Sequence, residues 1–320
     1  MNHAALAALA VRRTAAAGLV LVALSVLIFA ATEVLPGDAA GTLAGADATE
    51  AEREQLRRDL GLDTDPARRY IDWAAAAIRG DLGTGYVGRR EVVEVLADRL
   101  PNSLVLTTLA MAVAIPVAAA IGLVAGLRAG RRADRAVSTA TLVAVGVPEF
   151  LVAALLIAVF AAGLGLLPEV SLVPLGGRPW DSPEVLVLPV AALAVAATAA
   201  AGRLLRASVA DIAATPYVEA ARLRGVTGVR LALRHVLPNA AGPAVQVVAV
   251  MFAGLVGGAV VVETLFNYPG IGYELQQAVA NRDVPMVQGI TLAMSATTLT
   301  VLLLGDIAHL LLNPALRGRA

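Results

Sequence analysis

Between two strongly apolar segments the chain carries the polar sequence Glu219-Ala220-Ala221-Arg222-Leu223-Arg224-Gly225, which continues to His235-Val236-Leu237-Pro238. The composition around it is that of a membrane protein, because 58% of the 320 residues are hydrophobic and only 16% are charged. A soluble protein of this size carries more charge, so several membrane spans are predicted. A patterned polar loop between two spans is then expected to contact a partner.

The composition, and above all the residue types that the sequence lacks, excludes several classes of function. The 25 basic residues balance 25 acidic ones, which argues against a globally basic nucleic-acid binder. Without cysteine the chain has no disulfide, thiolate zinc site or thiol nucleophile. Lysine never occurs, so the P-loop lysine that holds ATP phosphates is absent, and any ATP must be bound by another chain. No Gly-x-Ser-x-Gly or His-Glu-x-x-His motif occurs either, and we expect no enzyme activity, metal or cofactor on this chain.

Six segments are long and apolar enough to cross a bilayer, which takes about 20 residues of helix. They are residues 10–35, 102–127, 136–167, 184–201, 240–262 and 287–312. The predicted fold is therefore an all-α integral membrane protein with six transmembrane helices. Three parts are expected: an N-terminal segment with the first helix (1–35), an extracytoplasmic helical insert (36–101) and a five-helix core (102–320) that contains the polar loop at 203–239.

Arginine placement predicts the orientation, because short cytoplasmic loops are rich in basic residues. The short loops on one side hold only Arg178 and Arg282. The other side, which includes both termini and the 203–239 loop, is expected to be cytoplasmic and carries Arg12, Arg13, Arg128, Arg131, Arg132, Arg135, Arg203, Arg206, Arg222, Arg224, Arg230, Arg234, Arg317 and Arg319. An alternative is that Arg12-Arg13 and the following apolar run form a cleaved signal peptide, although the run is longer than usual for one.

The 36–101 insert is predicted to contain three amphipathic helical pieces. Thr49 with Glu52 forms a capping box, and Asp65-Pro66 starts a second helix with proline at its first position. The third piece lies at 92–96 and leads into Pro101. These helices are too small for a core of their own, so they are expected to lie against the membrane domain, as a structural cap or as a contact for an extracytoplasmic partner.

Within the polar loop, two short helices are predicted. Thr215-Pro216 begins the first, and Gly225 supplies the turn that ends it. Pro238 is expected to close the second helix, whose single apolar face is predicted from residues at i, i+3, i+4, i+7 and i+8: Val229, Ala232, Leu233, Val236 and Leu237.

The spacing of this loop resembles the signature of binding-protein-dependent ABC importer permeases. His235 stands where that pattern usually has isoleucine, and the matching residues are Glu219, Ala220, Ala221, Gly225, Leu237 and Pro238. The resemblance implies a type I ABC importer permease-like fold, in which the loop sits in a cleft of a cytoplasmic ATPase.

Further segments resemble the dipeptide/oligopeptide/nickel permease family, of the first permease subunit type: Pro36-Gly37-Asp38, Leu60-Gly61-Leu62, Arg79-Gly80-Asp81-Leu82-Gly83, Arg99-Leu100-Pro101, Thr215-Pro216-Tyr217-Val218, Pro269-Gly270-Ile271-Gly272 and Arg282-Asp283. Two departures are Gly85, where the family usually has serine, and Asn313-Pro314-Ala315 in place of Asp-Pro-Arg.

The resemblance implies import of di- or oligopeptides across a bacterial-type plasma (inner) membrane, with nickel or glutathione-like solutes as alternatives. It also implies the partners: a second homologous permease, two cytoplasmic ATPase subunits that bind ATP and Mg, an extracytoplasmic solute-binding protein and the lipid bilayer, but no nucleic acid.

Polar residues inside the spans are candidates for the translocation path or a gate, since a membrane-embedded charge is costly. Glu149 is expected near the middle of the third span, and Glu263 with the Pro269-Gly270 turn at the outer end of the fifth. Asp306 can contact His309 at i+3. Each has a structural alternative: a packing hydrogen bond for Glu149, a plain turn for Pro269-Gly270, and an ordinary Asp–His pair. A proton-coupled secondary transporter that uses Glu149 and Asp306 is the rival function.

Overall fold

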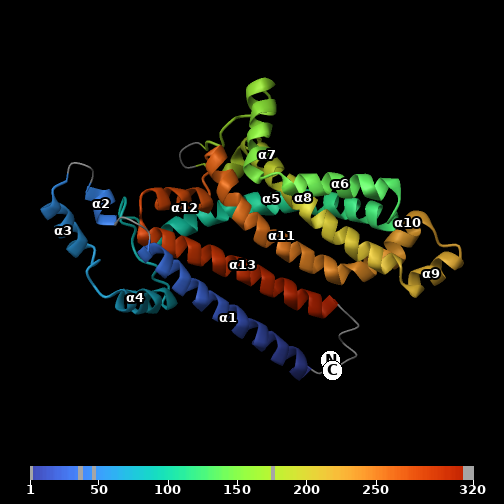
Figure 1. The fold of residues 1–320 in the computed structure, drawn as a ribbon, viewed down its shortest axis with the longest axis horizontal. Coiled ribbons are helices and arrows are strands. Elements are labelled where there is room, and N and C mark those ends of the chain that lie inside the picture. Colours follow the sequence, from blue (N-terminus) through green and yellow to red (C-terminus); the bar gives the residue numbers. More distant parts are fainter. Residues whose placement is uncertain (1–2, 35–38, 45–47, 174–176, 313–320) are drawn as a thin grey trace.

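The computed structural model describes residues 3–34, 39–44, 48–173 and 177–312, and across these ranges it is helical, with a single isolated β-bridge between Thr84 and Glu91. Five helices are long and apolar enough to cross a membrane. They are α1 (His3–Val34), α5 (Val92–Leu127), α8 (Glu184–Ala213), α11 (Leu237–Phe266) and α13 (Val284–Leu312), which lie side by side in Figure 1. The predicted all-α membrane fold is confirmed, and five of the six predicted spans fall within these helices.

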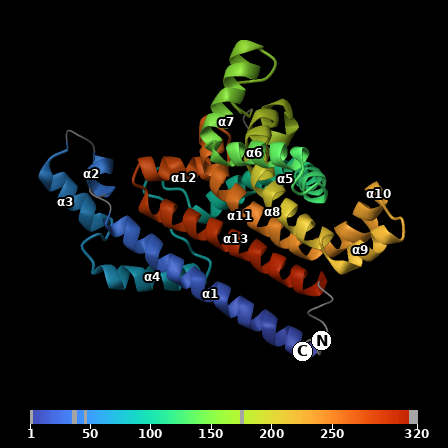
Figure 2. The ribbon, with the colours of Figure 1, turned by 45° about the vertical axis from the view of Figure 1, so that its right-hand side comes forward.

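The third predicted span is not one continuous helix. It consists of α6 (Arg132–Gly146) and α7 (Glu149–Leu156), which extends into the π-helical turn η1 (Ile157–Gly163), and the two parts meet at 95°. Pro148 explains the break, because its ring disfavours helical geometry at the preceding residue, and Val147 is extended at φ −85°, ψ 120°. Glu149 therefore begins α7 at the bend instead of lying in mid-helix. Figures 1 and 2 both show α7 standing out from the bundle.

Helix α8 packs closely on α5 through glycine. A Cβ at Gly126 would lie 2.6 Å from Cγ1 of Val209, and one at Gly122 would lie 2.7 Å from Cβ of Leu205. Only glycine lets the two backbones approach this far. The main core lies between α5, α8 and α11, where Leu106, Leu193 and similar side chains are fully buried.

The predicted start signals of the insert are confirmed. Helix α3 (Glu50–Asp59) has the Thr49/Glu52 capping box, and α4 (Pro66–Ile78) starts with Asp65 as its cap. A short helix, α2 (Ala39–Ala44), precedes them. The third piece is not separate, because α5 begins at Val92 and runs through Pro101.

Helix α4 lies against α1, as expected of the insert. The rings of Phe29 and Tyr70 meet edge to face with centroids 5.4 Å apart, and Trp73 packs beside both. The hydroxyl groups of Ser25 and Tyr70 share a hydrogen bond of 3.0 Å. These aromatic residues of α4 thus anchor the insert to the first span.

The loops separate into two groups at opposite ends of the bundle. One end holds α9 (Pro216–Leu223) and α10 (Gly228–Leu231), together with the beginning of α1 and the end of α13 (Figure 1). The other end holds α2 to α4 and α12 (Ile271–Ala280) (Figure 1). The 3-10 turn η2 (Pro179–Asp181) precedes α8, and the π-helical turn η3 (Ala232–Val236) joins α10 to α11. This grouping matches the predicted division into two sides. One segment of the resemblance, Pro36-Gly37-Asp38, and one departure from it, Asn313-Pro314-Ala315, lie outside the described residues.

Candidate functional site

The 215–238 loop is built as two helices around a tight turn. Thr215 precedes α9 and Pro216 is its first residue, as predicted, although the Thr215 hydroxyl donates to the carbonyl of Ile212 instead of capping α9. At the other end the amides of Gly225 and Val226 donate to the carbonyls of Arg222 and Ala221. These paired bonds form a Schellman motif, with Gly225 at φ +83°. Glycine is favoured there because a Cβ strains this conformation.

The inner face of the loop is packed onto the ends of two spans. Val218 and Val236 are fully buried, and Leu231 is nearly so. They form one cluster with Val209 of α8, and Leu127 of α5 packs against it. Ala221 is also buried, while Glu219 of the same motif points outward. Because the loop shares a core with α5 and α8, it is held as a rigid unit.

A polar contact across the loop holds α9 to η3. The hydroxyl of Tyr217 lies 2.9 Å from Nδ1 of His235, and the two rings pack with centroids 5.5 Å apart. His235 occupies the position where the family pattern usually has isoleucine, so this chain adds a hydrogen bond where an aliphatic side chain is usual.

The outer face of the loop exposes large apolar side chains. Leu223 is 83% exposed and Val229 is 72% exposed, with Tyr217, Leu233 and Leu237 also exposed. The predicted single apolar face of the second helix is therefore wrong. The side chains of Ala232 and Val236 turn inward while those of Val229, Leu233 and Leu237 face outward, because the π-helical geometry of η3 rotates the register away from a 3.6-residue repeat. The prediction that Pro238 closes this helix is also wrong, since η3 runs directly into α11 at Leu237.

A cavity of about 520 Å³ lies where α7, α8 and α11 meet. Its wall is almost entirely aliphatic, with Pro148, Ala197, Val250 and Met251 among the lining residues, and Glu149 is the single ionisable side chain in it. The carboxylate of Glu149 lies over Gly258 of α11, where a Cβ would collide with it. Gly254, one turn earlier, has no atom within 4 Å of a Cβ position and lines the open cavity.

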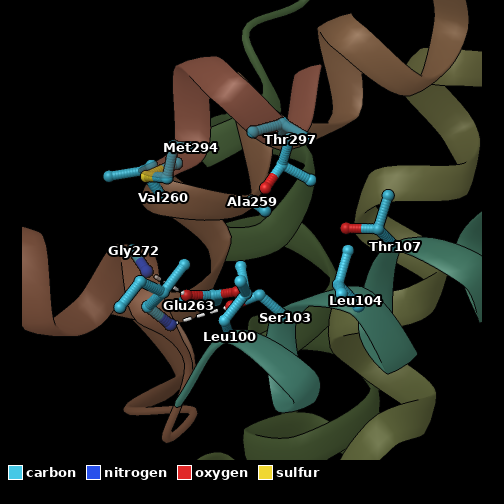
Figure 3. A pocket seen from close by; sticks show the side chains of 12 residues that line it. Leu100, Ser103, Leu104, Thr107, Ala259, Val260, Glu263, Gly272, Met294 and Thr297 are labelled. Atoms are coloured by element: carbon cyan, nitrogen blue, oxygen red, sulfur yellow. Dashed lines mark hydrogen bonds between the residues drawn. The ribbon is translucent and has the colours of Figure 1, made fainter. Parts of the chain in front are cut away.

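Glu263 is buried at the turn between α11 and α12 (Figure 3). Its Oε2 accepts hydrogen bonds from the amides of Gly272 at 2.7 Å and Tyr273 at 3.3 Å, the second and third residues of α12. A negative group is favoured at a helix N-terminus, so Glu263 holds α12 in place. The carboxylate lies so close to Gly270 that a Cβ there would overlap it.

The next contact of this turn reaches α5. Tyr268, fully buried, donates its hydroxyl to the carbonyl of Asn102 at 2.8 Å, and the amide nitrogen of Asn102 donates to the carbonyl of Pro269. Burial raises the pKa of Tyr268 above its usual value, so the hydroxyl stays neutral and can donate. The Pro269-Gly270 turn is thus a fixed structural element; its role at an outer gate remains a prediction.

Asp306 lies at the opposite end from Glu263. Its carboxylate accepts from Arg13 of α1 at 2.6 Å and from Gln246 of α11 at 3.1 Å. Gln246 and Gly258, the α11 neighbours of Asp306 and Glu149, are 12 residues apart, which is about 18 Å along a helix. The structure therefore does not bring Asp306 and Glu149 together. Across the described ranges no group of three or more histidine, aspartate or glutamate side chains could hold a metal ion.

The sequence did not reveal the anchoring role of two residues, Asp134 and Asp283. Asp134 in α6 is buried and accepts a bidentate pair of bonds from Arg206 of α8, at 2.8 and 2.7 Å, and a further bond from the amide of Gly130. Asp283 accepts from the amides of Tyr86 and Val87 and so holds the insert onto α13. The only signal of Asp134 in the sequence is a charge at a span end, and Asp283 belongs to the Arg282-Asp283 segment of the resemblance; neither signal identifies a partner.

A bundle of spanning helices with a helix pair at one end, apolar on its outer face, is the arrangement expected of an ABC importer permease. The chain belongs to the family described as binding-protein-dependent transport system inner membrane component, whose model matches residues 118–318. The model of the family's N-terminal membrane component matches residues 6–107. The chain is therefore a permease subunit of an ABC importer and a multi-pass protein of the inner membrane.

Similar proteins extend along almost the whole chain. The glutathione transport system permease protein GsiC of Escherichia coli O6:H1 (strain CFT073) is 35% identical over 293 residues, covering 92% of this chain and 93% of the relative. GsiC of Escherichia coli K12 shows the same identity and coverage, and GsiC of Shigella flexneri serotype 5b (strain 8401) is 34% identical over the same length.

Proposed function

We propose that this permease imports di- or oligopeptides, including tripeptides of the glutathione kind, and that it forms half of the translocation pathway beside a second homologous permease. The segments resembling dipeptide and oligopeptide permeases support this substrate class, and so do relatives named as glutathione permeases. Nickel import is the alternative within the same family.

The outward apolar face of the 215–238 loop is the observation that carries the proposed coupling role. Leu223 and Val229 are exposed; they belong to α9 and α10, which lie together at one end of the bundle (Figure 1). Burying one such side chain fully contributes about 1.5–3 kcal/mol. A cleft in a separate ATPase subunit would supply that burial, and the arginines at this end favour a cytoplasmic location, where such a subunit would be found.

The mechanism follows from how the loop is held. ATP and Mg would bind on the ATPase pair, since this chain has no P-loop lysine. Closure of that pair would push on α9 and η3, whose buried side chains share one cluster with α8. The loop would then move as a rigid lever and switch the spans from inward- to outward-facing, ready to accept solute from a binding protein docked on the insert and α12.

Substitution of one exposed residue tests this docking. Leu223→Asp places a charge on the outer face without disturbing the buried cluster, because Leu223 is 83% exposed. We expect the variant to insert normally but to lose a co-expressed ATPase subunit during purification in detergent. Ile78→Asp is the matched control, since Ile78 is 88% exposed at the other end of the bundle. Equal ATPase retention by both variants would overturn the proposed coupling surface.

A further inference from the structure

The cavity at Glu149 does not end there but adjoins a second one along α8. The second cavity, of about 620 Å³, is lined by Arg203, Arg206 and Ser138, and both cavities share Val145, Ala200 and Leu204 as wall. Along α8 the two together extend from Ala196 to Ala207, which is 11 residues and about 16 Å of helix. They form one groove between α6 and α8, referred to below as the α8 groove.

The negative and positive side chains of the α8 groove lie in different cavities. Glu149 lines the cavity at the bend between α6 and α7, and Arg203 and Arg206 line the cavity nearer the 215–238 loop. The guanidinium of Arg206 is already paired, since it donates two hydrogen bonds to Asp134. Neither Glu149 nor Arg203 has a hydrogen-bonding or ion-pair partner among the residues the structure describes.

An unpaired carboxylate between aliphatic walls is expensive in a membrane protein. Insertion scales put an acid at the centre of a spanning helix at about 2.5–3.5 kcal/mol, so such groups face water or a functional partner. The wall around Glu149 offers alanine, valine, leucine and methionine, which cannot offset that cost. A cation supplied from outside this chain would offset it.

We propose that the α8 groove is a solute-binding site for a zwitterion, with the ammonium group of the solute at Glu149 and its carboxylate at Arg203. This rests on the proposed function and adds a solute contact within the permease itself. An extended tripeptide spans about 10 Å, at 3.3–3.6 Å per residue, and fits within the 16 Å groove. The aliphatic walls between the two charges offer no polar groups that would distinguish one solute side chain from another. The groove therefore recognises the charged ends of the solute.

The absence of native cysteine allows a direct test that needs no knowledge of the natural solute. Val250→Cys places a thiol on the wall near Glu149, and Ala207→Cys places one near Arg203; both positions are exposed. Each variant, assembled in the full transporter in nanodiscs, is treated with a cationic (trimethylammonium) or an anionic (sulfonate) methanethiosulfonate reagent. Modification of this chain is followed by intact mass.

At Val250→Cys the cationic reagent is expected to react faster, and adding Glu149→Gln should lower the cation-to-anion rate ratio about tenfold, as expected for charges several ångströms apart in a partly screened site. At Ala207→Cys the anionic reagent should react faster, and Arg203→Gln should lower that preference by a similar factor. Glu184→Gln is the control, because Glu184 is exposed on α8 and lines neither cavity.

The peptide Ala-Ala-Ala is expected to slow modification at both positions, whereas its N-acetylated, C-amidated form should not. The proposal would be overturned if both peptides slowed the modification equally or if neither slowed it. It would also be overturned if the two thiols showed no preference for one reagent charge. A lack of reaction with both reagents would overturn it as well, since it would show that lipid or the second permease fills the groove. Retention of the ATPase is measured on the same preparations, so a failure of the groove is distinguished from a failure of the proposed transporter assembly.

Discussion

The Asp134–Arg206 pair offers the sharpest test of how α6 and α8 are joined. Asp134 is 3% exposed and accepts two bonds from the guanidinium, at 2.8 and 2.7 Å, with a third from the amide of Gly130 and a longer one from Ser138. Removing one partner of a buried pair costs about 3–5 kcal/mol because the other charge is left unpaired. The side chain of Arg206 is 35% exposed, so water relieves part of that cost and we expect about 2–3 kcal/mol.

The perturbation is a double-mutant cycle of Asp134→Asn, Arg206→Gln and the double variant. Unfolding free energies are measured at equilibrium in mixed detergent micelles. Each single variant should lose about 2–3 kcal/mol, and the double variant no more than the worse single one, giving a coupling energy above about 1.5 kcal/mol. Transport assays on the same variants should show ATP hydrolysis without matching uptake. Additive effects within about 0.5 kcal/mol would refute the reasoning, because independent residues behave that way.

Three further predictions follow from single contacts. Gly225→Asp should abolish ATP-driven uptake while leaving membrane insertion intact, since the turn requires φ +83° and a left-handed conformation costs a residue with a Cβ about 1–2 kcal/mol; normal uptake by the inserted variant would contradict this. Glu263→Ala should loosen α12 and raise amide hydrogen exchange at Gly272 and Tyr273 at least tenfold, as two bonds to the carboxylate are lost; unchanged exchange would show that the cap is dispensable. Gly85→Ser, the residue usual in the family, should lower the thermal midpoint, because a Cβ would lie 2.8 Å from Oδ2 of Asp283; an unchanged or raised midpoint would mean that Asp283 shifts freely.

Features with a short-range cause were predictable from sequence. The capping box at Thr49 and the proline-led start of α4 follow from two or three neighbouring residues, and both are confirmed. The spans follow from long apolar runs, and the Gly225 turn from a residue that tolerates positive φ. In each case the energy that fixes the structure lies within the local sequence.

Features that depend on a local departure from regular helix, or on contacts between residues far apart in the sequence, were not predictable. The third span was predicted to run through 136–167, yet the chain bends by 95° at Pro148, because the proline holds Val147 in an extended conformation. The second loop helix departs from a 3.6-residue repeat through η3, so periodicity assigned Val229 and Leu233 to the wrong face. The bond between Asp134 and Arg206 joins residues 72 positions apart, and only the tertiary structure shows it.

Helix α8 connects all the parts that the proposed function requires. Its C-terminal end, through Val209, shares a buried cluster with the 215–238 loop, and Arg206 fastens it to α6. One turn earlier, Arg203 and Ala200 form the wall of the α8 groove. A helix held at one end by a rigid loop and packed against glycine along α5 moves as a unit, because a tightly packed interface shifts between discrete arrangements and does not deform gradually. On the proposed mechanism, motion delivered to the loop would displace the groove wall directly, without an intervening relay, and the same short displacement would change both the access to Glu149 and the position of Arg203.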